Sequence, residues 1–202
     1  MTDRISTRDR LIDAAIAIIE AGGEAAVRVD VVTEQVGVTK PSLYHFFGDR
    51  DGLVTAAYAE MYRRSLLHGL REFHDAVVDA ATPEEYRRII ESTVVSFSDP
   101  EGIRRRAVRA SVIGSAVTRP TLQAAVVAVN REEMILLARA LEIGVKRGWS
   151  NLRHGPQATA YWWWGVLNGR HLVEIDDTLD AAAWDAVTLD AVSRLLFGAP
   201  AP

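Results

Sequence analysis

The chain has 202 residues, 49% of them hydrophobic, and a formal net charge of −4. This length and composition allow a substantial core in one domain or in two small ones. The absence of cysteine excludes disulfides, thiolate zinc sites and a cysteine nucleophile. Because acidic side chains outnumber basic ones, the chain as a whole does not have the positive charge that is typical of nucleic-acid-binding proteins.

The first predicted helix covers residues 7–21 and ends at the glycines that follow. Its apolar residues recur at the spacing of one helix face: Leu11, Ala14, Ala15, Ile18 and Ile19. Residues 1–54 as a whole hold six basic and nine acidic side chains. Any positive field in this part of the chain must therefore be local, made by a few residues on one face.

Two short helices, predicted over residues 30–36 and 40–46, flank Gly37, which supplies the backbone freedom for a sharp turn. The second of them is too short to be stable alone and must be held by its neighbours. If Leu43 faces inward, the outward residues are Thr39, Lys40, Ser42, Tyr44 and His45. This pattern predicts a helix-turn-helix, whose second helix reads the DNA major groove.

The run Gly37-Val38-Thr39-Lys40-Pro41-Ser42-Leu43-Tyr44-His45-Phe46-Phe47, followed by Gly48, Arg50 and Leu53, resembles the signature of the tetracycline-repressor-like (TetR) family of bacterial regulators. The resemblance covers about residues 7–54. It implies that Lys40 and Tyr44 contact phosphates, that Thr39, Ser42 and His45 lie at or near base edges, and that Arg50 meets a phosphate. The alternatives are a packing role for Tyr44 and simple solvation of Lys40 and His45.

The sequence departs from the family pattern where the second helix begins. Val29 stands where many relatives have Ser or Thr, and the following Asp30 would repel a phosphate unless it caps the helix. Arg28 can compensate for that acidic residue, and we include it among the expected DNA contacts.

The sequence after residue 50 predicts long helices. Thr82-Pro83-Glu84-Glu85 is a helix start, as is Asp99-Pro100-Glu101, and Lys146-Arg147-Gly148 is a helix end. The predicted helices are 50–78, 83–97, 100–116, 120–147, 156–176 and 181–197. We expect an all-α protein of about nine helices, with a helix-turn-helix domain at 1–50 and a ligand-binding and dimerisation bundle at 51–202. No apolar stretch is long enough to cross a membrane, so a cytoplasmic protein is expected.

Two copies of the chain are expected, because one short recognition helix makes too few contacts to select a site on double-stranded DNA. The resemblance assigns pairing to the last two long helices. Their apolar residues at helical spacing are Ala160, Trp163, Trp164, Leu167, His171, Trp184, Val187, Ala191 and Leu195. The alternative is that both stripes belong to the core of a single subunit.

The resemblance also implies a small-molecule effector bound among the helices of the second domain, and the aromatic residues of 161–164 suit an apolar or aromatic one. Polar or aromatic residues in apolar helices are the candidate contacts: Ser92, Ser96, Ser111, Ser115, Asn130, Trp162 and Asn168. Each of them could instead be a satisfied polar group between helices, or a packing residue in the case of Trp162.

An enzyme is the competing class of protein. The sequence has no nucleophile elbow, phosphate loop or His-Glu-x-x-His helix. His171 and Glu174 could share a helix face as a metal pair, but two ligands do not make a site. We therefore expect no catalytic residue, metal or cofactor, and a repressor released by its effector. A ligand-independent DNA-organising protein, or an activator, of the same fold is the alternative.

Overall fold

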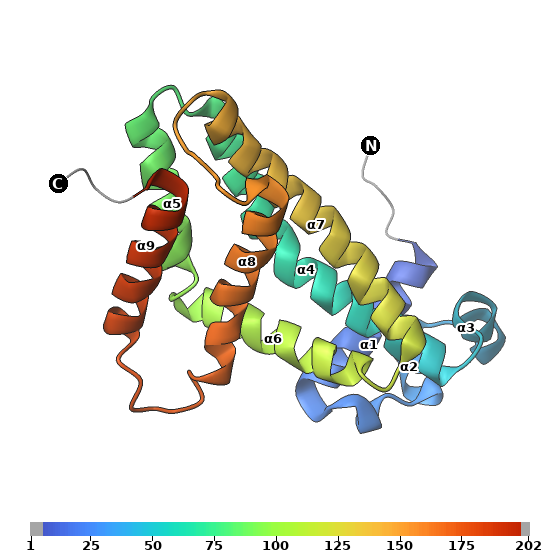
Figure 1. The fold of residues 1–202 in the computed structure, drawn as a ribbon. Coiled ribbons are helices and arrows are strands. Elements are labelled where there is room, and N and C mark those ends of the chain that lie inside the picture. The colour runs from blue at the N-terminus through green and yellow to red at the C-terminus, as the bar shows by residue number, and fades with distance from the viewer. Residues whose placement is uncertain (1–5, 199–202) are drawn as a thin grey trace. The chain divides into compact units, whose positions relative to one another are not determined.

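The computed structural model describes residues 6–198, apart from the side chains of residues 67 and 68. This part of the chain forms nine α-helices, two 3-10 helices and no strand, so the predicted all-α class is confirmed. The elements, drawn in Figure 1, are α1 (Thr7–Gly22), η1 (Glu24–Ala26), α2 (Val29–Val36), α3 (Lys40–Phe47), α4 (Arg50–Asp79), α5 (Pro83–Ser96), α6 (Pro100–Ala116), α7 (Pro120–Lys146), α8 (Gly155–Gly169), η2 (Arg170–Leu172) and α9 (Ala181–Phe197). None of the described helices is long and apolar enough to cross a membrane.

Side-chain caps explain where several helices begin. The hydroxyl of Thr82 accepts a hydrogen bond from the Glu85 backbone N–H at 3.2 Å, and Glu85 in turn accepts one from the backbone N–H of Ala81 at 2.7 Å. Ser6 caps α1 and Asp180 caps α9 in the same way. Each cap satisfies backbone donors that the first turn leaves without helical partners.

The helices form two compact units. The N-terminal unit comprises residues 6–64 and Ser111–Val127, and the C-terminal unit comprises Ser65–Ala110 and 128–198. Consequently α4, α6 and α7 each contribute residues to both units. This division by packing differs from the predicted functional boundary after residue 50, which stays a prediction.

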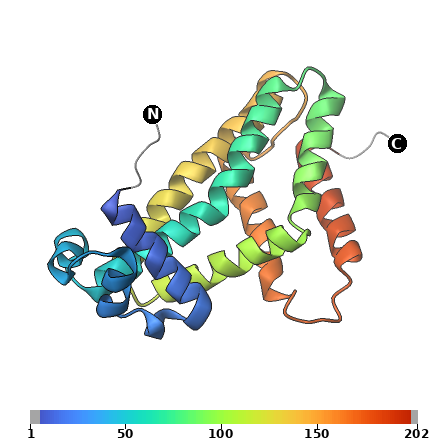
Figure 2. The ribbon, with the colours of Figure 1, turned by 180° about the vertical axis from the view of Figure 1, so that it is seen from behind.

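In the N-terminal unit, α1 packs against α2 and α3 (Figure 2). The predicted stripe of α1 supplies the core, since Leu11 and Ala15 are fully buried, as are Val32 of α2 and Leu43 of α3. A hydrogen bond of 2.6 Å from Arg10 Nη2 to the backbone carbonyl of Val36 ties α1 to the end of α2. These contacts hold two helices that are too short to be stable alone.

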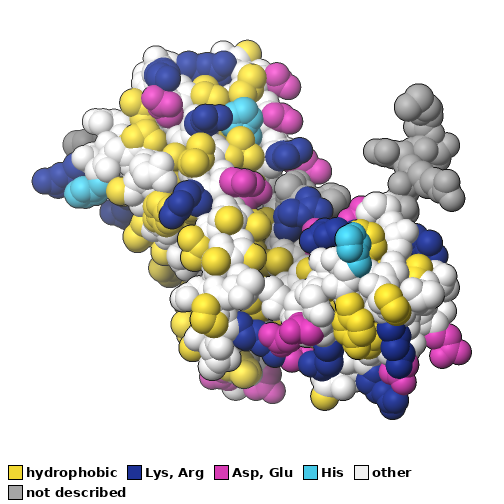
Figure 3. Space-filling model, turned by 90° about the vertical axis from the view of Figure 1, so that its right-hand side faces the viewer, with side chains coloured by type: hydrophobic (Ala, Val, Ile, Leu, Met, Phe, Trp, Pro, Cys, Tyr) yellow, Lys and Arg dark blue, Asp and Glu magenta, His cyan; other side chains and the backbone are white. Residues whose placement is uncertain are grey.

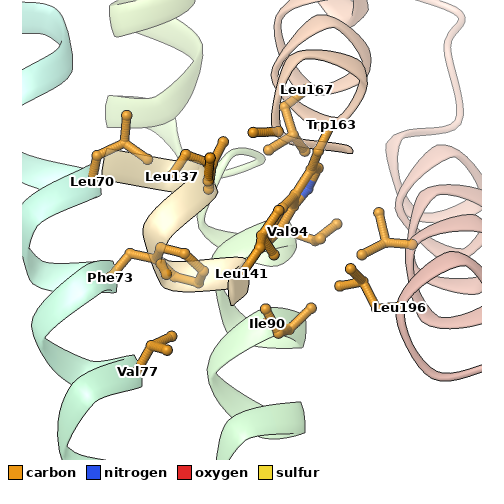
Figure 4. Close-up of a cluster of buried hydrophobic side chains, with 14 of the residues drawn as sticks. Leu70, Phe73, Val77, Ile90, Val94, Leu137, Leu141, Trp163, Leu167 and Leu196 are labelled. Atoms are coloured by element: carbon orange, nitrogen blue, oxygen red, sulfur yellow. The ribbon is translucent and has the colours of Figure 1, made fainter. Parts of the chain in front are cut away.

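The C-terminal unit has its own apolar core, shown in Figure 4. Phe73 of α4 and Trp163 of α8 meet edge to face with their ring centroids 5.6 Å apart. Around them lie Ile90 of α5, Leu141 of α7 and Leu196 of α9, all buried. Five helices thus share one core, and α5 also packs directly against α9.

The helix predicted over residues 156–176 ends earlier than expected. α8 stops at Gly169, a single 3-10 turn follows, and the segment up to Asp180 consists of turns. Glycine is a poor helix former, and just beyond it Arg170 and Glu174 are engaged in ion pairs with other helices. These tertiary contacts outweigh the local helical pattern.

Candidate nucleic-acid interface and internal cavity

The α2–α3 pair has the geometry of two helices joined by a three-residue turn. Gly37 adopts the left-handed conformation (φ 72°, ψ 42°) that the turn requires. The backbone N–H of Val38 bonds to the carbonyl of Thr33 at 3.0 Å and closes the end of α2. Thr39 then caps α3 by accepting from the Ser42 backbone N–H, and Pro41 occupies the first turn.

The outward face of α3 is polar and aromatic. Leu43 is completely buried, whereas Lys40, Tyr44 and His45 are exposed, Tyr44 to 46%. Ser42 is half-buried at the edge of this face. A short helix fixed through Leu43 can therefore present Lys40, Tyr44 and His45 to a large partner.

Phe46 is an exposed aromatic that the sequence pattern does not assign to the site. It is 40% exposed, and its ring lies edge-on to that of His45 with centroids 5.4 Å apart. Two consecutive phenylalanines on a helix point about 100° apart. Because Phe47 is half-buried beneath the guanidinium of Arg8, Phe46 is left outside.

Arg28 and Thr39, two of the predicted DNA contacts, also bind within the chain. Arg28 donates to Asp30 through Nε at 3.2 Å and Nη2 at 2.8 Å, and this pairing lowers the pKa of the Asp30 carboxyl. Asp30 therefore does not cap α2, whose cap position is Arg28. The hydroxyl of Thr39 is engaged as the cap of α3.

Arg50 has a structural role that the resemblance did not imply. Its Nε donates to the carbonyl of Val27 at 2.7 Å and its Nη2 to the carbonyl of Glu24 at 2.6 Å. The side chain is half-buried and holds η1 against the start of α4. The expected phosphate contact would compete with these bonds and stays a prediction.

A cluster of charges links η1 to the turn between α6 and α7 within the N-terminal unit. Arg119 pairs with Glu24, and the Tyr58 hydroxyl donates to the same carboxylate at 3.4 Å. The hydrogen bond from Arg119 lowers the pKa of Glu24 against the opposing effect of burial. The 95 residues between the partners explain why the sequence pattern did not reveal this pair. On the face shown in Figure 3, basic and acidic side chains are interspersed.

The low pKa of Glu24 makes its contribution to stability depend on pH. A carboxyl whose pKa is lowered by folding stabilises the protein above its unfolded pKa, and this stabilisation is lost as the pH falls through the folded pKa. We expect Glu24→Gln to lower the free energy of unfolding by about 1 kcal/mol near neutrality, since the pair is partly exposed. The difference should vanish well below the ordinary value of 4.5.

Urea unfolding of both proteins at several pH values measures this difference. Glu20→Gln, on the exposed side of α1, is the matched control and should change little. A Glu24→Gln deficit that persisted in acid would show that the carboxylate charge is not its cause.

The C-terminal unit contains a partly open cavity of about 490 Å³. Its apolar wall includes Leu70 and Phe73 of α4, Leu137 of α7, and Trp163 and Leu167 of α8. The polar and charged lining side chains come mainly from α5, α6 and the turn between them, among them Ser92, Thr93, Ser96, Asp99, Arg105 and Arg109. A mostly apolar cavity with a few polar groups is typical of a small-molecule site.

Two of the seven predicted ligand contacts, Ser92 and Ser96, line this cavity. Ser111 and Ser115 belong to the N-terminal unit, and Asn130 lies outside the lining. Asn168 does not line the cavity, but its Oδ1 accepts a hydrogen bond of 2.6 Å from Nε of Arg109, which does. Trp162 is 42% exposed, and the neighbouring Trp163 and Trp164 line the cavity in its place.

The family model described as "Bacterial regulatory proteins, tetR family" matches residues 11–57. The N-terminal part of the chain is a tetR-family domain. The predicted resemblance is thus confirmed, and it includes α1, α2, α3 and the start of α4.

Curated relatives extend the match beyond this domain. The chain is 37% identical over 92 residues to the HTH-type transcriptional regulator BetI of Brucella canis and to that of Brucella melitensis biotype 1. The match covers 45% of this chain and 43% of each relative, so the chain spans less than half the length of these proteins.

Solved structures match almost the whole fold. A TetR-family transcriptional regulator from Agrobacterium tumefaciens has a TM-score of 0.60 and 24% identity over 94% of this chain and 97% of its own. A protein from Saccharomonospora viridis in complex with choline has a TM-score of 0.66, 14% identity and coverages of 94% and 96%. The fatty acid degradation regulator FadR of Bacillus halodurans has a TM-score of 0.62, 16% identity and coverages of 95% and 96%.

C-terminal to the tetR-family domain, the predicted dimer residues do not form one surface. Ala160, Trp163 and Leu167 are buried in the subunit's own core, and Trp164 lines the cavity. Ala160, Trp163 and Leu167 are therefore inaccessible to a partner in this structure, whereas Trp164 is half-buried. On α9, Val187 is 71% exposed, while Trp184, Ala191 and Leu195 are half-buried.

The exposed aromatic residues of α8 are Tyr161 and Trp162, which lie beside the predicted stripe. Both faces of this helix are apolar, so helical spacing alone could not tell which of them points inward. The structure assigns the core to the face of Trp163 and leaves Trp162 outside.

His171 and Glu174, which the sequence offers as a possible metal pair, belong to an ion-pair cluster instead. Glu174 binds the guanidinium of Arg106, and His171 Nδ1 lies 3.0 Å from the same carboxylate. Among the described residues there is no group of three or more His, Cys, Asp or Glu that could hold a metal ion. The Glu174 carboxylate is instead an ion-pair partner of arginine.

Proposed function

We propose that this chain is a DNA-binding regulator of transcription that acts in the cytoplasm as a homodimer. Each subunit inserts α3 into one half of an inverted-repeat operator, and a small molecule in the cavity releases the DNA. The observation that carries the proposal is the arrangement of α3, in which buried Leu43 fixes the helix while Lys40, Tyr44 and His45 face outward. The match of residues 11–57 to the tetR family supports the same conclusion.

Dimerisation is supported by the exposed apolar residues of the last two α-helices. Tyr161 and Trp162 of α8 and Val187 of α9 are all accessible. Apolar and aromatic groups of this kind are enriched in the centres of protein interfaces. We propose that Tyr161 and Trp162, which lie beside the predicted stripe of α8, contribute to a two-fold interface.

The cavity supports the effector part of the proposal. The similar protein from Saccharomonospora viridis was solved with choline bound, and the Bacillus halodurans protein regulates fatty acid degradation. An effector releases DNA only if it binds the DNA-incompetent conformation more tightly than the competent one. The cavity also favours this proposal over a ligand-independent DNA-organising protein, because such a protein does not require a ligand-binding cavity.

The role of Lys40 in binding phosphates gives a testable prediction. Lys40→Ala should weaken binding to all DNA sequences and reduce the slope of log affinity against log salt by about one unit. Ser42→Ala should instead relax the choice of sequence and leave the slope unchanged. Fluorescence anisotropy over a salt series measures both effects. An unchanged slope in Lys40→Ala would remove the phosphate contact from the proposal.

A further inference from the structure

The most deeply buried charge in the cavity lining is the guanidinium of Arg109. The residue is only 5% exposed, and it lies on α6 facing the lining residues of α4 and α8. Its Nε donates to Asn168 Oδ1 at 2.6 Å and its Nη1 to the backbone carbonyl of Ser65 at 2.8 Å. These two bonds hold a positive charge at a set position in the cavity wall.

The same guanidinium covers two aromatic rings. Its central carbon lies 5.3 Å from the centroid of the Trp164 ring and 5.8 Å from that of Phe97, and both residues line the cavity. Aromatic faces attract cations, and cages of such rings bind quaternary ammonium groups. Here the chain's own cation is placed against these rings. A cationic ligand would therefore meet Arg109 at the position where it needs an aromatic face.

The other charged side chains of the lining do not cancel the positive charge of Arg109 in the buried part of the cavity. Glu72 and Asp99 are exposed, and Asp99 accepts a hydrogen bond from the backbone N–H of Gly102 at 2.6 Å. Arg105 is half-buried, 3.7 Å from Glu101. Because a charge acts more strongly in a low-dielectric interior than near water, Arg109 dominates the deep end of the cavity.

We propose that the cavity selects anionic amphiphiles, namely monocarboxylic acids with an apolar or aromatic body. The carboxylate binds Arg109, since guanidinium groups offer donors in the planar arrangement that carboxylates accept. The body of the ligand packs against Phe73, Leu137 and Trp163. This inference rests on the proposed function, because it gives the chemical class of the effector.

Three probes with the same aryl chain and different head groups test the charge preference. They are 4-phenylbutanoate, its neutral amide, and 3-phenylpropyltrimethylammonium, titrated into the full-length protein by calorimetry. We expect the acid to bind at least about tenfold more tightly than the amide, which is the size of one charge-assisted hydrogen bond. The ammonium compound should bind more weakly than the amide. Ammonium binding as tight as that of the acid, or no binding by the acid, overturns the proposal.

Variants assign the preference to Arg109. Arg109→Met keeps an unbranched side chain that fills part of the same space and removes the charge, so the acid and the amide should bind about equally. Arg109→Lys should retain part of the preference, and it decides the question if the methionine variant does not fold. Arg88→Met, at an exposed arginine of α5 outside the lining, is the matched control. An unchanged preference in Arg109→Met contradicts the assignment.

The ligand titrations test the cavity inference independently of the proposed DNA binding, because they use protein without DNA. Acid binding by a protein that retains no DNA fragment would leave the cavity inference standing and remove the regulator. Sequence-specific DNA binding without acid binding would do the reverse.

Discussion

We expect replacement of Glu174 by glutamine to lower the free energy of unfolding by about 3–5 kcal/mol, the usual cost of removing one partner from a buried ion pair. The side chain of Arg106 is 0% exposed and that of Glu174 is 11% exposed. The Nε of Arg106 donates to the carboxylate at 3.2 Å, and the Nε of Arg170, another buried arginine, lies 3.4 Å from it. Glutamine would leave two buried guanidinium groups facing a neutral amide.

The pKa of Glu174 gives this prediction a dependence on pH. Burial alone would raise that pKa, but the hydrogen bonds from Arg106 and His171 outweigh burial and lower it. The carboxylate therefore stabilises the fold above its unfolded pKa, and the stabilisation is lost as the pH falls through the lower folded value. The difference between Glu174→Gln and the unmodified protein should be full at neutral pH and shrink in acid.

An exposed ion pair provides the control for Glu174. Asp190 and Arg194 of α9 are 2.8 Å apart with both side chains about 60% exposed, so Asp190→Asn should cost less than about 1 kcal/mol. Urea unfolding of the two variants compares them directly. Equal losses would mean that the buried cluster around Arg106 is no more important for stability than a surface pair.

The second large effect is expected at Gly52, in the first turn of α4. A Cβ there would lie 2.0 Å from the backbone carbonyl oxygen of Phe47, the last residue of α3. Neither group is flexible, so Gly52→Ala must push the end of α3 away from α4. We expect a loss of about 1–3 kcal/mol or more in stability, and a loss of sequence-specific DNA binding because α3 no longer has its position.

Gly114 is the matched control for this substitution. It lies in α6 within the N-terminal unit, and a Cβ there would meet nothing within 4 Å. Gly114→Ala should therefore leave DNA binding intact and stabilise the helix by up to about 1 kcal/mol. Melting temperatures, together with DNA anisotropy measured far below them, separate the two effects. DNA binding of normal strength by folded Gly52→Ala would contradict the expected displacement of α3.

The sequence predicted those parts of the fold that local chemistry determines. Thr82 with Pro83, and Asp180, mark helix starts because their side chains or rings act on the neighbouring backbone. Gly37 and Leu43 predict the turn and the orientation of α3 for the same reason. The end of α8 was predicted too late because ion pairs with distant residues decide it.

The cavity and the buried charges could not be predicted in this way. Arg109 meets Asn168 from a position 59 residues away, and Arg106 meets Glu174 from 68 residues away. In the sequence, the run Arg104-Arg105-Arg106 and Arg109 predict a solvated helix face, with receipt of an anionic ligand or coupling to the DNA-binding domain as the lesser alternatives. Likewise, Trp163 is buried and Trp162 is exposed because of the helices that pack against α8, and helical spacing alone does not reveal which helices those are.

Selection of duplexes from a random DNA library by the purified full-length protein tests the central claim most directly. The account predicts enrichment of an inverted repeat whose half-sites lie about one helical turn apart, some 34–36 Å, and weaker enrichment of that repeat in Ser42→Ala, whose side chain is expected at a base edge. Retained DNA with no sequence enriched over the starting library, or the same enrichment in Ser42→Ala, would contradict the assignment of α3 as the element that reads DNA.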